Sequence, residues 1–88
     1  MKVRVMRNFR LRHKIPLEEL ARQGGCSAQW LSQAELKNIP LGDIAKAKIL
    51  GAFQGVLESR GQALSEMRAD FRKTKNRFFK EENEWTDL

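Results

Sequence analysis

The sequence predicts an all-α protein, and three observations support this prediction. Apolar residues recur at helical spacing, and no segment alternates apolar and polar residues as a half-buried strand does. Pro16 and the pair Gly24-Gly25 divide the first half into short segments. The second half carries a longer apolar repeat with heptad spacing. We therefore expect about four short helices followed by a long C-terminal helix or a helical hairpin.

Four helices are expected in the first half, and they cover Lys2 to His13, Leu17 to Gln23, Ala28 to about Lys37, and a segment that starts near Leu41. Proline disfavours helical geometry in the residue before it, so Ile15-Pro16 ends the first helix. One of the two glycines suits the left-handed position after the second helix. Ser27 supplies an N-cap oxygen for the third helix, and Asn38 is expected just beyond its end.

The apolar repeat of the second half forms a seam. Alternate steps of three and four residues from Leu50 to Trp85 mark eleven positions, and eight of them are apolar. Gly61 lies inside the seam, so one long helix and two helices meeting near Ser59 to Gly61 both fit. The seam could pack on the N-terminal core, on its own other half or on a second copy. We favour a homodimer, with seam residues Leu57, Leu64, Met67, Phe71, Phe78 and Trp85.

The length of 88 residues is too small for two independent cores. We expect one folded unit, which consists of an N-terminal region, residues 1–48, and a packing or dimerisation segment, residues 49–88. There is no stretch of about 18 apolar residues and no apolar run behind the basic N-terminus. A cytoplasmic protein with no membrane contact is expected.

The surplus of positive charge lies wholly in the first half. The formal net charge is +6, and residues 1–48 hold ten Lys or Arg against four acids, whereas residues 49–88 hold seven of each. This asymmetry is typical of a segment that faces a polyanion, although a basic face without a partner also fits. The residues expected to neutralise phosphates are Arg4, Arg7, Lys37, Lys46 and Lys48. In the second half we expect Glu81, Glu82 and Glu84 to balance Lys73, Lys75 and Arg77 on a solvated surface.

The stretch LEELARQGGCSAQWLSQAE meets the packing demands of a helix-turn-helix unit. Small or apolar residues fall where the two helices cross, and they are Leu20, Ala21, Gly25, Cys26, Leu31 and Ala34. The residues left facing outward are Ala28, Gln29, Ser32, Gln33 and Leu36 or Lys37. Glutamine suits adenine, whereas serine and lysine suit phosphates or guanine, so Ser27 is a further expected phosphate contact. This chemistry favours double-stranded DNA as the partner.

Residues Met6 to about Lys48 also resemble the helix-turn-helix of Cro and phage repressors, the XRE family, through Glu-Glu-Leu-Ala, a Gly-Cys-Ser turn and Leu-Ser-x-x-Glu. The resemblance implies base reading by Ala28, Gln29 and Gln33, with Ser32 beside them. It also implies a phosphate contact by Trp30 and a charged pair, Arg10 with Glu35, that ties the first helix to the recognition helix. Gly24 departs from the family, which places a large apolar residue there. The segment after Leu50 resembles instead the longer tail of small phage or mobile-element regulators.

Two functions are compatible with these features. The first is a homodimeric repressor that reads the major groove with residues 28–37. In the second, the helix pair is a scaffold and the seam of residues 50–85 binds another protein, as in an antitoxin or an assembly component of a phage or mobile element. The sequence contains no nucleophile–base pair, no paired carboxylates expected in an apolar pocket and no phosphate-cradling glycine loop, and Cys26 is the single cysteine. We expect neither an enzyme nor a metal or other cofactor.

Overall fold

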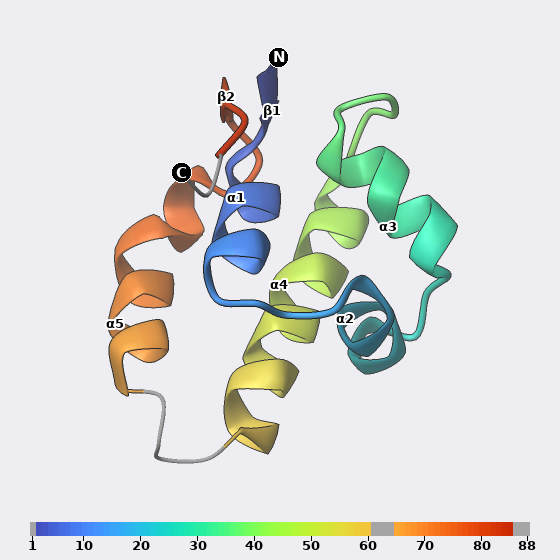
Figure 1. The fold of residues 1–88 in the computed structure, drawn as a ribbon. Coiled ribbons are helices and arrows are strands. Elements are labelled where there is room, and N and C mark those ends of the chain that lie inside the picture. The colour runs from blue at the N-terminus through green and yellow to red at the C-terminus, as the bar shows by residue number, and fades with distance from the viewer. Residues whose placement is uncertain (1, 61–64, 86–88) are drawn as a thin grey trace.

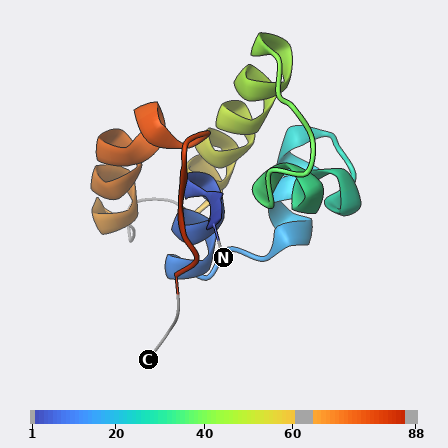
Figure 2. The same ribbon diagram turned by 90° about the horizontal axis from the view of Figure 1, so that it is seen from above.

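The computed structural model describes residues 2–60 and 65–85 of the chain. It is mostly helical, as predicted, and adds a small two-stranded sheet. In chain order the elements are β1 (Lys2–Arg4), α1 (Val5–Arg12), α2 (Leu17–Gly24), α3 (Ala28–Glu35), α4 (Asp43–Ser59), α5 (Ser65–Thr74), the 3-10 turn η2 (Lys75–Arg77) and β2 (Glu81–Asn83). Helix α4 runs through the middle, with α5 on one side and the α2–α3 pair on the other (Figures 1 and 2).

Four phenylalanines from distant parts of the chain form the centre of the core. The ring centroids of Phe9 and Phe53 lie 5.5 Å apart, and those of Phe53 and Phe78 lie 4.8 Å apart. Phe71 joins them at 5.4 Å from Phe78. Most of these pairs meet edge to face or tilted, the arrangement that the ring quadrupole favours. Because α1, α4, α5 and the turn after η2 each contribute a ring, both halves of the chain share one core.

The predicted seam turns inward on this core. Leu57, Met67, Phe71 and Phe78 are all buried within the chain itself, so they are not available to a second copy. Leu64 lies outside the described residues, and Trp85 is half-buried, with its backbone N–H donating to Asn8 Oδ1 at 2.7 Å. The assignment of Leu57, Met67, Phe71 and Phe78 to a dimer seam was therefore wrong, and the intramolecular alternative holds for these four residues. The single long helix is also excluded, because α4 ends at Ser59 and α5 begins at Ser65.

The first helix begins later than predicted because β1 precedes it. Lys2, Val3 and Arg4 pair with Asn83, Glu82 and Glu81 in an antiparallel ladder. The β-branched Val3 is fully buried, and opposite charges face each other at the Arg4–Glu81 position. The first amides of α1 have no side-chain cap, and the C-terminal segment supplies their acceptors. The N–H groups of Val5 and Met6 donate to the carbonyls of Lys80 and Phe78 at 2.8 and 3.0 Å.

Helix ends in the middle of the chain follow the predicted signals closely. Gly25 is left-handed with φ of 65° after α2, and the Ser27 hydroxyl accepts from Trp30 N–H at 3.0 Å at the start of α3. Helix α3 ends two residues early, and Lys37 with φ of 59° takes the left-handed position that we predicted for Asn38. Helix α4 begins at Asp43, slightly later than the predicted start near Leu41.

Gly24 permits a close approach between α2 and α4. A Cβ placed on Gly24 would lie 3.0 Å from Ala52 Cβ on α4 and 3.5 Å from Cys26 Sγ. Ala52 is itself buried, so it cannot withdraw without a movement of α4. The large apolar residue of the family pattern has no room here, because α4 fills its place.

Helix α5 is attached to α1 by a charged cluster at the surface. The Asp70 carboxylate accepts from Arg12 Nη2 at 2.8 Å and from His13 Nε2 at 2.5 Å. Burial raises the pKa of Asp70, but the hydrogen bonds and charges of Arg12 and His13 outweigh it, so this pKa lies below its ordinary value. The ionised form of Asp70 is therefore more stable in the folded chain than in the unfolded one.

We predict that Gly24→Val lowers the free energy of unfolding by about 1–3 kcal/mol, because the added methyl groups overpack the α2–α4 contact. Gly51→Ala is the matched control. Gly51 is a solvent-exposed position in the middle of α4, with no atom within 4 Å of an added Cβ. Its replacement by alanine should raise the free energy of unfolding by about 0.4–1 kcal/mol. Urea unfolding of both variants measures the difference. Equal stabilities for the two variants would contradict the close approach.

We predict that Asp70→Asn lowers stability at pH 7 by about 1 kcal/mol, the upper end of the range for a solvent-exposed ion pair. Since the folded pKa is depressed, the contribution of Asp70 is present above its unfolded pKa of about 3.9 and disappears as the pH falls below it. The stability curves of wild type and variant should converge in that acidic range. Glu66→Gln, at an exposed position on the same helix, should leave the curve unchanged.

Candidate nucleic-acid interface

Helix α3 presents one packed face and one polar face. Leu31, Ala34 and Glu35 are fully buried against the rest of the chain. Gln29 is exposed, and Ala28, Ser32 and Gln33 are half-buried on the remaining surface. The predicted base-reading residues thus lie together on a single short helix. The Gln33 side chain is held in place, because its Oε1 accepts from Asn38 Nδ2 at 2.8 Å.

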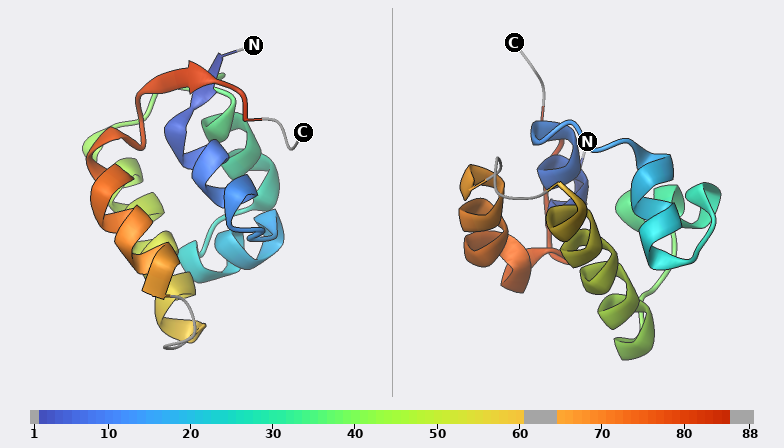
Figure 3. Two further views of the ribbon diagram at one scale, coloured as in Figure 1. Left: turned by 60° about the vertical axis from the view of Figure 1, so that its left-hand side comes forward. Right: turned by 90° about the horizontal axis from the view of Figure 1, so that it is seen from below.

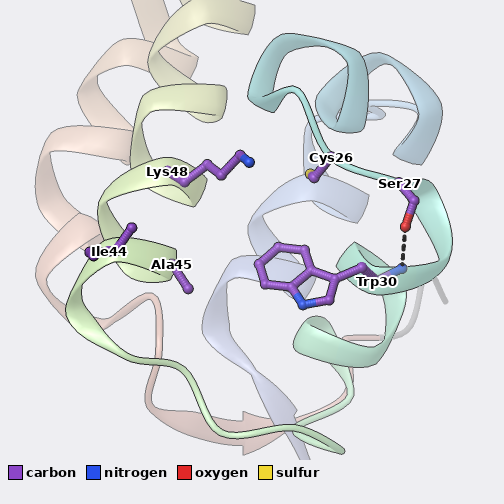
Figure 4. A pocket seen from close by; sticks show the side chains of 6 residues that line it. All are labelled: Cys26, Ser27, Trp30, Ile44, Ala45 and Lys48. Atoms are coloured by element: carbon purple, nitrogen blue, oxygen red, sulfur yellow. Dashed lines mark hydrogen bonds between the residues drawn. The ribbon is translucent and has the colours of Figure 1, made fainter.

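An open groove lies beside the start of α3, where that helix faces α4. Its volume is about 560 Å³, and its lining residues are Cys26, Ser27, Trp30, Ile44, Ala45 and Lys48. Three residues predicted to contact phosphate, Ser27, Trp30 and Lys48, therefore meet here although they come from two elements. Figure 4 shows the Trp30 indole extending from α3 toward α4, with Lys48 across the groove. Both an aromatic face and a cation are thus available to a ligand at this end of α3.

The orientation of α3 is fixed by a buried ion pair. Arg10 on α1 donates from Nε to Glu35 Oε2 at 2.6 Å and from Nη2 to Glu35 Oε1 at 3.0 Å. A third donor, Arg10 Nη1, reaches the carbonyl of Ile15 at 3.0 Å. This is the pair that the resemblance implied, in bidentate geometry. It joins α1 to the last turn of α3 and to the segment that leads into α2.

Arg4 and Arg7 were expected to reach phosphate, and the structure turns both inward. Arg4 donates from Nη1 to the carbonyl of Ala34 at 2.7 Å and from Nη2 to the carbonyl of Ile39 at 2.9 Å. It satisfies free carbonyls at the end of α3 and in the following loop. Burial lowers the pKa of the Arg4 guanidinium from its ordinary value, and the charge of Glu81 opposes this change. Arg7 donates to Glu35 and to Glu84 at 3.3 and 3.2 Å.

Of the three lysines predicted to contact phosphate, two interact with other side chains of the chain and one does not. Lys37 pairs with Glu81 on β2 at 2.9 Å, with both side chains near half exposure. Lys46 Nζ lies 5.7 Å from the centroid of the Phe79 ring, within the range of a cation–π contact. Lys48 forms no ion pair with another described residue and faces the groove. Of the predicted phosphate contacts, Ser27, Trp30 and Lys48 form one site, and the others are engaged with the chain itself.

Two residues of this surface were missed from the sequence. Ile44 is 87% exposed at the first turn of α4 and lines the groove. Nothing in its local sequence distinguishes it from the buried apolar positions of the same helix. Asn38 was read as a helix end and instead orients Gln33. Among the described residues, no group of three His, Cys, Asp or Glu could hold a metal ion, and no helix is long and apolar enough to cross a membrane.

Comparisons with known proteins add no relative to this picture. No family model matches the chain, and neither a curated protein nor a solved structure matches it.

We predict that Glu35→Ala lowers the free energy of unfolding by about 3–5 kcal/mol, because it leaves the buried Arg10 guanidinium without its carboxylate. Chemical denaturation followed by circular dichroism measures this loss. Glu58→Ala removes an exposed carboxylate from α4 and should change stability by no more than about 0.5 kcal/mol. A loss below about 1 kcal/mol at Glu35 would show that the pair is not what fixes α3.

Proposed function

We propose that this chain is a sequence-specific, double-stranded DNA-binding regulator that places α3 in the major groove as the second helix of a helix-turn-helix unit. The observation that carries the proposal is the polar face of α3, where Gln29 and Gln33 stand on a helix whose opposite face is fully buried. An α-helix fits the major groove, and each glutamine can form two hydrogen bonds with adenine. The resemblance of residues Met6 to Lys48 to the XRE family supports the same reading.

The rigid mounting of α3 supports this proposal. Its start is capped by Ser27, its last turn is held by Arg10, and its terminal carbonyl at Ala34 is bonded by Arg4. A helix fixed at both ends loses little conformational freedom when it binds, so more of its contact energy contributes to affinity. Asn38 also holds the side-chain amide of Gln33 in place. This amide still has its two Nε2 donors and a second lone pair on Oε1 for hydrogen bonds to a base.

The groove at the start of α3 supplies the expected phosphate contacts. Lys48 provides a cation, and the Ser27 hydroxyl and the Trp30 indole N–H provide further polar groups beside it. Lys46, two residues before Lys48 on α4, does not line this groove and lies beside the Phe79 ring instead. In this arrangement α4 tracks one DNA strand while α3 enters the groove. Arg4, Arg7 and Lys37, which were first expected to bind phosphate, instead support the helix that reads the bases.

We further propose that two copies bind an inverted repeat and act as a repressor, with recognition helices about 34 Å apart along one face of DNA. The two copies must then meet through a surface other than Leu57, Met67, Phe71 and Phe78 of the seam, since these four residues belong to the core. The same burial counts against the alternative in which the seam binds another protein, because Phe71 and Phe78 would have to leave the core to do so.

The proposal is tested by selecting bound sequences from a random pool of double-stranded DNA at near-physiological salt with excess non-specific competitor. Enrichment of one motif is expected, and an inverted repeat would identify a dimeric reader and give the spacing of its half-sites. Binding without enrichment that vanishes as salt rises would overturn sequence-specific recognition, because such binding comes from phosphate contacts alone.

We predict that Gln33→Ala costs about 1–3 kcal/mol of binding free energy and relaxes the preference at one base position. Lys48→Gln is the contrasting variant. It should weaken binding to all sequences alike and reduce the slope of log K against log salt by about 1. Fluorescence anisotropy with the selected sequence and its single-base variants measures both effects. An unchanged base preference in Gln33→Ala would rule out this glutamine as a reading residue.

A further inference from the structure

A second hollow is lined by residues of α4, α5 and η2. Helix α5 lies on the side of α4 away from α3 (Figures 1 and 3). The volume of the hollow is about 220 Å³, and its lining residues are Gln54, Leu57, Arg68, Phe71, Arg72 and Lys75. Leu57 and Phe71 are buried and form an apolar floor. Three cations and one amide form the rest of the lining, and no acid contributes to it. The hollow therefore combines a closed base with a concentrated positive rim.

The three cations share one face of α5 and its continuation into η2. Arg68, Arg72 and Lys75 are spaced by four and three residues, which places like charges next to one another. Cations at a helix C-terminus are favoured by the macrodipole, and this explains Arg72. It does not explain Arg68 in the middle of the helix. Arg68 is half-buried, and its Nη2 donates to the carbonyl of Leu57 at 3.3 Å, so this guanidinium is held beside the hollow.

The acids expected to balance this region pair with residues elsewhere. Glu81 binds Lys37, Glu84 binds Arg7, and Glu82 accepts from Asn8 Nδ2 at 2.9 Å. Asp70, the acid in the middle of α5, binds Arg12 and His13 on α1. None of the ion pairs between described residues includes Arg68, Arg72 or Lys75. The positive rim of the hollow is left unneutralised within the described part of the chain.

We propose that this hollow binds a phosphoryl anion, in the form of a small ligand such as pyrophosphate or a phosphate monoester. Two arginines and a lysine match the oxygen atoms of phosphate as charge-assisted donors. The volume is below the range of about 300–1,000 Å³ that is usual for drug-sized ligands, so it suits a group of few atoms. A concave site with an apolar floor also suits a compact ligand better than it suits the surface of a duplex. This inference does not depend on DNA binding by α3.

The test is a titration of the full chain, labelled with ¹⁵N, with pyrophosphate at constant ionic strength, followed by amide chemical shifts. We expect saturable shifts confined to α5, η2 and the second half of α4, with a Kd on the order of 1 mM or tighter for three charge-assisted contacts. Arg72→Gln/Lys75→Gln should weaken this binding by at least about tenfold. Both side chains are exposed, so the fold should persist, and the spectrum of the free variant verifies this.

The control is Lys73→Gln/Arg77→Gln, which removes the same charge from exposed residues of α5 and η2 that do not line the hollow. It should bind pyrophosphate as the wild type does. Equal weakening in the two double variants, or no saturable shift in the wild type, would overturn the proposal. A parallel titration with a short DNA duplex separates the sources of phosphate. Shifts of α5 with the duplex but not with pyrophosphate would likewise overturn a small-ligand site.

Discussion

The buried carboxylate of Glu35 links segments of the chain that are distant in sequence. It accepts from Arg10 and from Arg7, both on α1. Through Arg10 it is connected to the carbonyl of Ile15 before α2, and through Arg7 to Glu84 near the C-terminus. A fully buried acid is costly unless its charge and its lone pairs are satisfied, and two guanidinium groups satisfy them here. Helix α3 can therefore dock in one orientation only.

The C-terminal segment contributes to the same network from the opposite direction. Its carbonyls at Phe78 and Lys80 accept from the first amides of α1, and β2 pairs with β1. β1 in turn carries Arg4, whose guanidinium holds the end of α3. The last described residues of the chain thus stabilise a helix that lies some fifty positions earlier (Figure 3). The C-terminal segment is part of the support of the candidate interface, whereas the sequence predicted a packing or dimerisation segment within one folded unit.

The features that sequence analysis predicted well are those that depend on neighbouring residues. Gly25, the Ser27 cap and the break at Pro16 act within one turn, so their signals are present in a short window. The sheet could not be predicted in this way, because an alternation over three residues is too short to indicate a strand, and Lys2–Arg4 pairs with the distant Glu81–Asn83. The seam was correctly predicted to be apolar. The spacing of its apolar residues does not show whether they pack on the same chain or on a second copy. The Arg10–Glu35 pair came from the resemblance and not from any local pattern.

Contacts between distant residues also explain why the distribution of charge along the sequence does not predict the distribution of charge on the surface of the fold. Residues 1–48 hold the whole formal surplus, yet several of their cations are engaged: Arg4 by carbonyls, Arg7 and Lys37 by acids of the C-terminal segment, and Arg12 by Asp70. In the formally neutral second half, Asp70, Glu81, Glu82 and Glu84 bond to residues of the first half, and cations remain open on α5. After this long-range pairing, open positive charge lies on both sides of α4, at the groove with Lys48 and at the hollow with Arg72. A polyanion and a small anion would meet different faces of one small core.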